Sequence, residues 1–286
     1  MSPRSPIDLD AIRRRHEGHF RRFDRSRLQA AGAGAVALVL LVYAMADLGF
    51  FDGRLIAGMG RLFEITGLML PPDPGSWAHV HTIAVALAET VAIALLGTLT
   101  AAVLALPLAF VAARNITAQR VVRFLARRSL DTIRSVDILV WALIWVNVVG
   151  LGPFAGALAI MTAEIGTFGK LFSEAIEAAD RKPVEGITAA GGGRLMGVRF
   201  GILPEVFPVL ASQVLYFIES NTRSASIIGI VGAGGIGLYL AEAIRTLELQ
   251  QTSFIILMIL ATVALIDYLS SQLRFAVIGR RPMAAR

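Results

Sequence analysis

Residues 185–204 read Glu-Gly-Ile-Thr-Ala-Ala-Gly-Gly-Gly-Arg-Leu-Met-Gly-Val-Arg-Phe-Gly-Ile-Leu-Pro. The three glycines at 191–193 interrupt a helix, because glycine costs about 1 kcal/mol relative to alanine in a helix interior. Pro204 suits the first turn of a following helix, where its missing N–H breaks no hydrogen bond. The stretch therefore predicts two short helical pieces with a glycine hinge between them. Such a pair is a lever that a partner protein can grip, or alternatively an amphipathic loop that lies on a membrane.

The composition identifies an integral membrane protein. Of the 286 residues, 56% are hydrophobic and 17% are charged, against about 25% charged in an ordinary globular chain. The mean hydropathy is +0.68, and this much apolar surface excludes the soluble, disordered and nucleic-acid-binding classes despite a pI near 10.4. The chain has no cysteine, which excludes disulfides, thiolate metal sites and cysteine nucleophiles, and its four histidines form no metal-binding pattern.

The apolar runs predict six membrane-spanning helices. One run, 138–169, is too long for a single crossing at about 1.5 Å per residue. The glycines and proline within 150–156 divide it into two short spans. The other four spans are 28–46, 80–113, a fifth from Pro204 or Glu205 to Gly229, and 253–278. The predicted fold class is therefore all-α and integral to the membrane.

The basic residues are distributed so that both termini are expected in the cytoplasm. With six spans, 23 of the 27 lysines and arginines fall on one side, and cytoplasmic loops carry such an excess. Residues 1–27 hold eight arginines and are expected to form a cytoplasmic amphipathic helix on an anionic leaflet, or a frayed basic tail. Residues 28–79 then contain the first transmembrane helix and an external loop, and 279–286 form a basic cytoplasmic tail.

The hinged stretch resembles a loop found in permease subunits of binding-protein-dependent ABC importers. Glu185, Gly191, Leu203 and Pro204 have the spacing of that loop, although the two positions after Glu185 are not its usual alanines. The resemblance covers residues 80–278, with the coupling loop at 174–204. Further stretches are similar to the phosphonate importer permease: Pro107–Asn115, Arg134–Val136, Gly150–Gly156, Glu219–Arg223 and Gly229–Gly237.

The resemblance implies the type I ABC importer permease fold and a set of partners. It implies a homodimer of permeases in the bacterial inner membrane, two ATPase subunits on the cytoplasmic loops, and a periplasmic substrate-binding protein outside. ATP and Mg²⁺ would bind the ATPase partner, so this chain would hold no cofactor or metal and have no catalytic residue. Consistent with this, the sequence contains no Gly-x-x-x-x-Gly-Lys-Ser/Thr loop. The residues implied in coupling to the ATPase are Glu185, Gly191, Gly192, Arg194, Leu203 and Pro204.

The implied function is ATP-driven import of phosphonate or a related phosphorus oxyanion by alternating access. A sibling importer for phosphite or methionine is the alternative, and an autonomous anion channel would need no ATPase. A membrane oxidoreductase is a remote alternative, because Gly232–Gly237 reads Gly-x-Gly-x-x-Gly. A dinucleotide site requires a strand–turn–helix–strand unit, however, and a span-length apolar run follows instead. We interpret Gly232, Gly234 and Gly235 as allowing close helix approach at a dimer seam or an outer gate.

Charged residues inside the apolar runs are candidate path residues, because charge is costly in lipid. Glu219 and Arg223 are four residues apart on one helix and can form an ion pair. They are expected beyond the midplane on the outer side, where Arg223 either fixes helix packing or meets the anion, with Asn221 as a neutral donor. Asp267 is expected to hydrogen-bond between helices in the core, and Arg274 is assigned to the inner membrane boundary.

Overall fold

The computed structural model describes residues 25–51, 53–117 and 119–278, which form two units divided between Gly67 and Leu68. The first unit contains α3 (Arg25–Asp47) and most of α4 (Arg54–Leu68). Most of the expected amphipathic segment 1–27 and all of the expected tail 279–286 lie outside the described residues.

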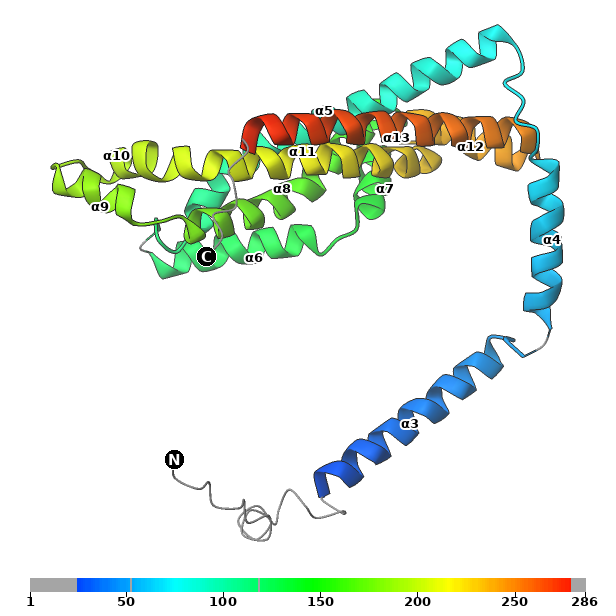
Figure 1. Cartoon of the computed structure of the whole chain (residues 1–286), viewed down its shortest axis with the longest axis horizontal. Coiled ribbons are helices and arrows are strands. Elements are labelled where there is room, and N and C mark those ends of the chain that lie inside the picture. The colour runs from blue at the N-terminus through cyan, green and yellow to red at the C-terminus, as the bar shows by residue number, and fades with distance from the viewer. Residues whose placement is uncertain (1–24, 52, 118, 279–286) are drawn as a thin grey trace, which may run out of the picture. The chain divides into compact units, whose positions relative to one another are not determined.

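The regular elements in the described part of the second unit are helices joined by short loops (Figure 1). None of the described residues forms a strand, so the all-α prediction is confirmed there. The helices of this unit are α5 (Trp77–Ala112), α6 (Arg120–Arg134), α7 (Ile138–Val149), α8 (Pro153–Ala178), α9 (Lys182–Ala189), α10 (Arg194–Met196), the π-helical turn η1 (Gly197–Ile202), α11 (Leu203–Ile228), the 3-10 turn η2 (Gly229–Val231), α12 (Ile236–Arg245) and α13 (Leu249–Ile278).

Helix α8 is central to this bundle and packs against α5, α6, α7 and α11. Its contact with α5 is close because small residues line it. A Cβ atom on Gly97 of α5 would lie 2.7 Å from Cβ of Ile160 and 2.9 Å from the carbonyl oxygen of Ala157. Ala101, Ala105 and Ala109 of α5 are fully buried. Small residues bring helix backbones together and increase dispersion contacts where lipid provides little hydrophobic driving force.

The predicted break in the run 138–169 is confirmed, because α7 ends at Val149 and α8 begins at Pro153. The predicted count of six spans is not fully reproduced. Four helices in the described residues are long and apolar enough to cross a membrane, and a fifth is added if α6 and α7, bent by 87°, form one span.

Two helices account for the difference in the count. Helix α7 has 12 residues, about 18 Å, which is too short to cross about 30 Å of hydrocarbon alone. Helix α8 has 26 residues, but it carries Glu164 and Lys170 and is therefore less apolar than a lipid-facing span. This composition is compatible with its central position, because protein rather than lipid surrounds much of α8.

Candidate coupling segment and transport path

Residues 182–202, comprising α9, α10 and η1, form what we call the coupling segment. Helix α9 ends in a Schellman motif, in which Gly191 has a φ of 85°. The N–H of Gly191 donates to the carbonyl of Thr188 at 3.0 Å, and the N–H of Gly192 donates to the carbonyl of Ile187 at 2.9 Å. The predicted pair of helical pieces with a glycine hinge is therefore present.

The two arms of the coupling segment pack against each other. Val184 of α9 lies against two glycines of η1, and a Cβ on Gly201 would be 2.9 Å from Cγ2 of Val184. Beyond this contact, at the return of the hairpin, Leu195 and Met196 have exposed fractions of 85% and 56%. The segment is thus a compact hairpin with an apolar tip.

The second arm continues into α11 without a break. The π-turn η1 precedes Leu203, and Pro204 and Pro208 occupy the first turns of α11. Because proline has no N–H, the carbonyl of Phe200 cannot accept the usual bond from residue 204, and a wider turn accommodates this loss. The expected proline in the first turn of the fifth span is confirmed, but the helical run begins earlier, at Arg194.

This continuity favours the lever over a loop lying on the membrane. The run from Arg194 to Val231 has 38 residues, about 57 Å, and therefore exceeds the hydrocarbon thickness of about 30 Å. Figure 1 shows α9 and α10 extending past the ends of the neighbouring helices along the direction of α11.

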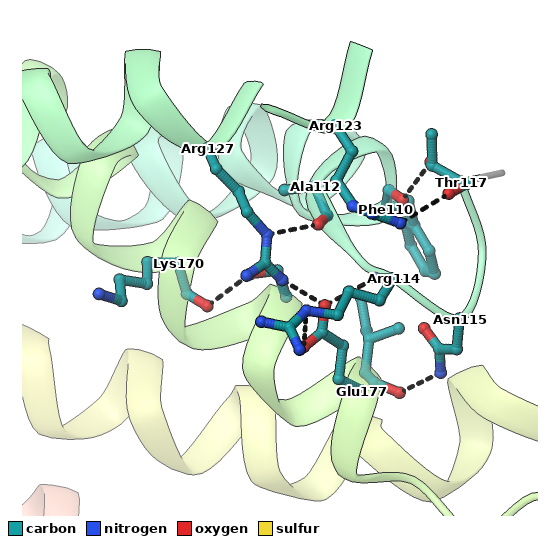
Figure 2. Close-up of polar contacts among 11 residues, drawn as sticks. Phe110, Ala112, Arg114, Asn115, Thr117, Arg123, Arg127, Lys170 and Glu177 are labelled. Atoms are coloured by element: carbon teal, nitrogen blue, oxygen red, sulfur yellow. Dashed lines mark hydrogen bonds and ion pairs between the residues drawn. The ribbon is translucent and has the colours of Figure 1, made fainter. Parts of the chain in front are cut away.

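The base of the coupling segment is held by a group of residues that we call the Glu177 clamp: Glu177, Arg114 and Arg127 (Figure 2). The carboxylate of Glu177, at the end of α8, pairs with the guanidinium of Arg127 from α6. The same carboxylate accepts the backbone N–H of Arg114 at 2.6 Å. Nε of Arg127 donates to the carbonyl of Ala112 at 3.0 Å, so one arginine joins α5, α6 and α8.

Two more hydrogen bonds lie next to the segment, one near its start and one across its two ends. Nδ2 of Asn115 donates to the carbonyl of Ile176 at 2.7 Å. On the other side, the carboxylate of Glu205 in the first turn of α11 accepts the N–H of Asp180 at 2.8 Å. The segment is therefore continuous with α11 at one end and follows α8 at the other, and the end of α8 is tied to α6 and to the end of α5.

The predicted Glu219–Arg223 pair is present, with 3.8 Å between Oε1 of Glu219 and Nη2 of Arg223. A second arginine, Arg274 of α13, places Nη2 at 3.6 Å from Oε2 of Glu219. The same nitrogen lies 3.7 Å from Oδ1 of Asp267. The prediction for Asp267 was wrong, because this side chain is 58% exposed and pairs along its own helix instead of in the core.

The contact between Glu219 and Arg274 also corrects the depths in the membrane that the sequence predicts for these two residues. Glu219 was placed beyond the midplane and Arg274 at the inner boundary, yet the two side chains touch. The expected depth of Glu219 in the membrane was counted along the helix from Pro204. The helical run begins at Arg194 instead, and α13 continues to Ile278. Glu219 therefore lies level with the C-terminal part of α13.

Asn221 lies on a different face of α11 from Glu219 and Arg223. It is 2% exposed, and its Nδ2 donates to Oγ1 of Thr98 on α5 at 2.9 Å. Glu164 of α8 is also buried in the bundle, with an exposed fraction of 7%. The Asn221–Thr98 hydrogen bond joins α5 and α11 inside the bundle, whereas the side chain of Arg223 is 61% exposed.

Residues 232–235, which we call the glycine loop, pack on the break between α7 and α8. The carbonyl of Gly232 accepts the N–H of Gly152 at 2.9 Å. Gly234 has a φ of 82°, and a Cβ there would lie 2.6 Å from the backbone nitrogen of Pro153. The predicted close approach is therefore present within one chain.

The start of α12, directly after the glycine loop, is capped by α5. Thr90 Oγ1 accepts the N–H of Ile236 at 2.8 Å, and the Glu89 carboxylate accepts the N–H of Gly235 at 3.3 Å. A carboxylate at this position is favourable because helix N-termini carry partial positive charge. The 3-10 turn η2, and no strand, precedes this loop, so the strand–turn–helix geometry of a dinucleotide site is missing here.

Comparison with protein families decides the class of the protein. The model of the family described as binding-protein-dependent transport system inner membrane component matches residues 105–280. The chain belongs to this family. The match spans the Glu177 clamp, the coupling segment, Glu219–Arg223 and the glycine loop. The protein is therefore a multi-pass membrane transport permease.

Individual relatives agree with this assignment. The chain is 35% identical over 257 residues to the putative phosphite transport system permease protein HtxC of Stutzerimonas stutzeri, covering 90% of this chain and 89% of the relative. It is 50% identical over 117 residues to the putative cryptic phosphonate transport system permease protein PhnE2 of Escherichia coli K12, covering 41% of this chain and 96% of the relative.

A solved structure shows the same fold. The MetNI methionine ABC transporter in an inward-facing conformation contains a chain that superposes with a TM-score of 0.62 at 18% identity. The superposition covers 71% of this chain and 99% of that chain. The type I importer permease fold predicted from the sequence is thereby confirmed.

Sequence reasoning found the coupling segment but missed the Glu177 clamp and Arg274. Glu177 lies 50 residues from Arg127 in the chain, so no local spacing indicates their contact. The only sequence signal was indirect: six arginines in Arg114–Arg134 require carboxylate partners or solvent.

Proposed function

We propose that this permease moves phosphonate or a related phosphorus oxyanion, such as phosphite, across the inner membrane by alternating access driven by a partner ATPase. The observation that carries the proposal is the coupling segment. It projects beyond the bundle and continues into α11 without a break, and the Glu177 clamp holds the end of α8 that leads into it. A force applied to the segment would therefore move several membrane-spanning helices together.

The ATPase subunit would dock on the coupling segment. The apolar tip at Leu195 and Met196 is exposed, as expected for a surface that a protein partner covers. A cavity of about 590 Å³ lies between the segment and the end of α5, and Arg114, Thr188 and Arg194 are among its lining residues. ATP and Mg²⁺ would be held by the ATPase. We assign coupling to Glu185, Gly191, Gly192, Arg194, Leu203 and Pro204.

The transport path would run along the exposed face of α11. Arg223 is the cation on that face with the geometry to meet an anion, and a charge within a span requires a protein or water-filled surrounding. Glu219 would hold the arginine between transport events, and Asn221 would brace α11 from inside the bundle. The glycine loop, with Gly232, Gly234 and Gly235, would form part of the outer gate.

A second permease would complete the path, and we propose a homodimer with both termini of each chain in the cytoplasm. The outer end of the chain supports this, because Leu151 and Phe154 at the α7–α8 break and Ile227 of α11 are exposed apolar residues. A periplasmic substrate-binding protein would dock on the same outer end. Disulfide crosslinking of paired cysteines placed at Phe154 or Ile227 would test the dimer.

The cargo assignment rests on the relatives and on charge. Relatives named for phosphite and phosphonate transport share 35% and 50% identity with the chain over their aligned lengths. The methionine transporter shares 18% identity and therefore supports the fold alone. An arginine on the candidate path suits an oxyanion, since guanidinium groups bind phosphate-like oxygens in pairs.

The test is reconstitution of the permease with its companion subunits. The complex that co-purifies with the tagged permease should contain an ATPase, which mass spectrometry identifies. In proteoliposomes supplied with the binding protein and internal ATP, methylphosphonate or phosphite should accumulate and methionine should not. Accumulation without the ATPase would support a channel, and selective methionine uptake would refute the cargo.

A further inference from the structure

The two arginines around Glu219 differ in their environment. Arg274 approaches Oε2 of Glu219 at 3.6 Å, and the side chains of these two residues are 22% and 17% exposed. Arg223 approaches Oε1 at 3.8 Å, but its side chain is 61% exposed. The arginine partner of Glu219 that is itself largely buried is thus Arg274 on the neighbouring helix α13. The sequence suggests Arg223 instead, because it lies four residues from Glu219 on the same helix.

Because of these environments, the two ion pairs contribute differently to the stability of the protein. In the water-filled path proposed above, an ion pair with one largely exposed partner is screened and contributes little to stability. When both partners are largely buried, removal of one leaves an uncompensated charge and is strongly destabilising. Arg274 also contacts Asp267 at 3.7 Å, so it remains neutralised when Glu219 alone is replaced. Arg223 therefore contributes little to folding.

We propose that Arg274 is the structural counter-ion of Glu219 and that Arg223 is thereby free to leave Glu219 and bind the phosphorus oxyanion. The proposal rests on the transport function proposed above and assigns a ligand class to one residue of its path. In the absence of anion, Arg223 rests on the half-buried carboxylate. When the oxyanion arrives, Arg223 exchanges carboxylate oxygens for those of the ligand, and Arg274 keeps Glu219 neutralised.

The exchange is favourable only because two cations share one carboxylate. If Glu219 depended on Arg223 alone, transfer of the arginine to the ligand would leave a half-buried anion without a partner. With Arg274 in place, Glu219 keeps a guanidinium contact after Arg223 has moved, while Asp267, which shares Arg274, is 58% exposed. Arg274 is thus a positioning residue, while Arg223 is the residue that touches the ligand.

The experiment compares three variants in the assembled transporter with its ATPase and binding protein. Arg223→Gln should give a wild-type amount of complex and an unchanged melting temperature, while uptake of methylphosphonate and phosphite falls at least tenfold. Arg274→Gln should lower both the amount of complex and its melting temperature. Adding Glu219→Gln to Arg274→Gln removes the unpaired charge and should restore the melting temperature.

Arg128→Gln is the matched control. Arg128 is 67% exposed and pairs with Asp131 on its own helix at 3.6 Å, so it resembles Arg223 in exposure and partner geometry but lies on α6. This control should keep both complex and uptake.

Two results would overturn the proposal. If Arg223→Gln lowers the melting temperature as much as Arg274→Gln does, Arg223 is a structural partner of Glu219. If Arg223→Gln keeps full uptake, it does not bind the transported anion. Failure of the proposed function would look different, because the wild-type complex itself would transport neither methylphosphonate nor phosphite, while the stability comparison of the two arginines would still be readable.

Discussion

Replacement of Gly191 by alanine tests the backbone conformation of the hinge without adding a steric clash. Gly191 has a φ of 85°, and a Cβ atom there would have no neighbour within 4 Å. Any effect therefore comes from the backbone, and a left-handed conformation costs a non-glycine residue about 1–2 kcal/mol. This cost corresponds to a change of about 5–30-fold in the population of the native hinge. Because the space is open, leucine should cost about as much as alanine.

The assay is methylphosphonate uptake per ATP hydrolysed in proteoliposomes. Gly191→Ala should assemble normally but transport less per ATP, because the hinge no longer holds the two arms of the coupling segment in register. Gly193→Ala is the matched control: its φ is −75° and a Cβ there also meets open space. Equal coupling ratios in the two variants would show that the left-handed hinge does not matter for force transfer.

Three other perturbations follow from the structure. In this cysteine-free chain, Asp73→Cys should react with an impermeant thiol reagent from outside. Arg120→Cys should react only after the membrane is opened. External labelling of Arg120→Cys would contradict the proposed topology. Thr90→Val removes the buried acceptor of the Ile236 N–H and should cost about 1–3 kcal/mol, seen as a lower melting temperature. Gly156→Ala would push a methyl group into the backbone of the glycine loop, so the yield of folded protein should fall; a normal yield would mean that this contact is loose.

Local signals predicted the features that depend on local geometry. The glycines at 191–193 weaken a helix and the proline at 204 favours its first turn wherever they occur, so the hinge and the place of Pro204 in α11 were predictable, although the helical run itself begins earlier, at Arg194. The same holds for the division between α7 and α8, where Gly150 and Gly152 have positive φ values and Pro153 starts a helix.

Contacts between helices were not predictable from the same sequence. Arg223 was found because residues four apart on a helix must share a face, whereas Arg274 was missed because the register of α13 against α11 leaves no local pattern. The Glu177 clamp was missed for the same reason. The sequence counts α8 as a span, but its composition is less apolar than that of a lipid-facing helix because protein surrounds much of it.

The contact between the glycine loop and the α7–α8 break has a consequence for how the outer end could open. It is made by backbone groups, such as the Gly152 N–H and the Gly232 carbonyl, together with small residues and the apolar side chain of Leu151. No titrating side chain and no ion pair has to separate there, and a released N–H or carbonyl can bond to entering water. The free energy needed to separate these surfaces should therefore be nearly constant across pH and ionic strength. When the outer end opens would then be decided by the ATPase that docks on the coupling segment, at the opposite end of the molecule.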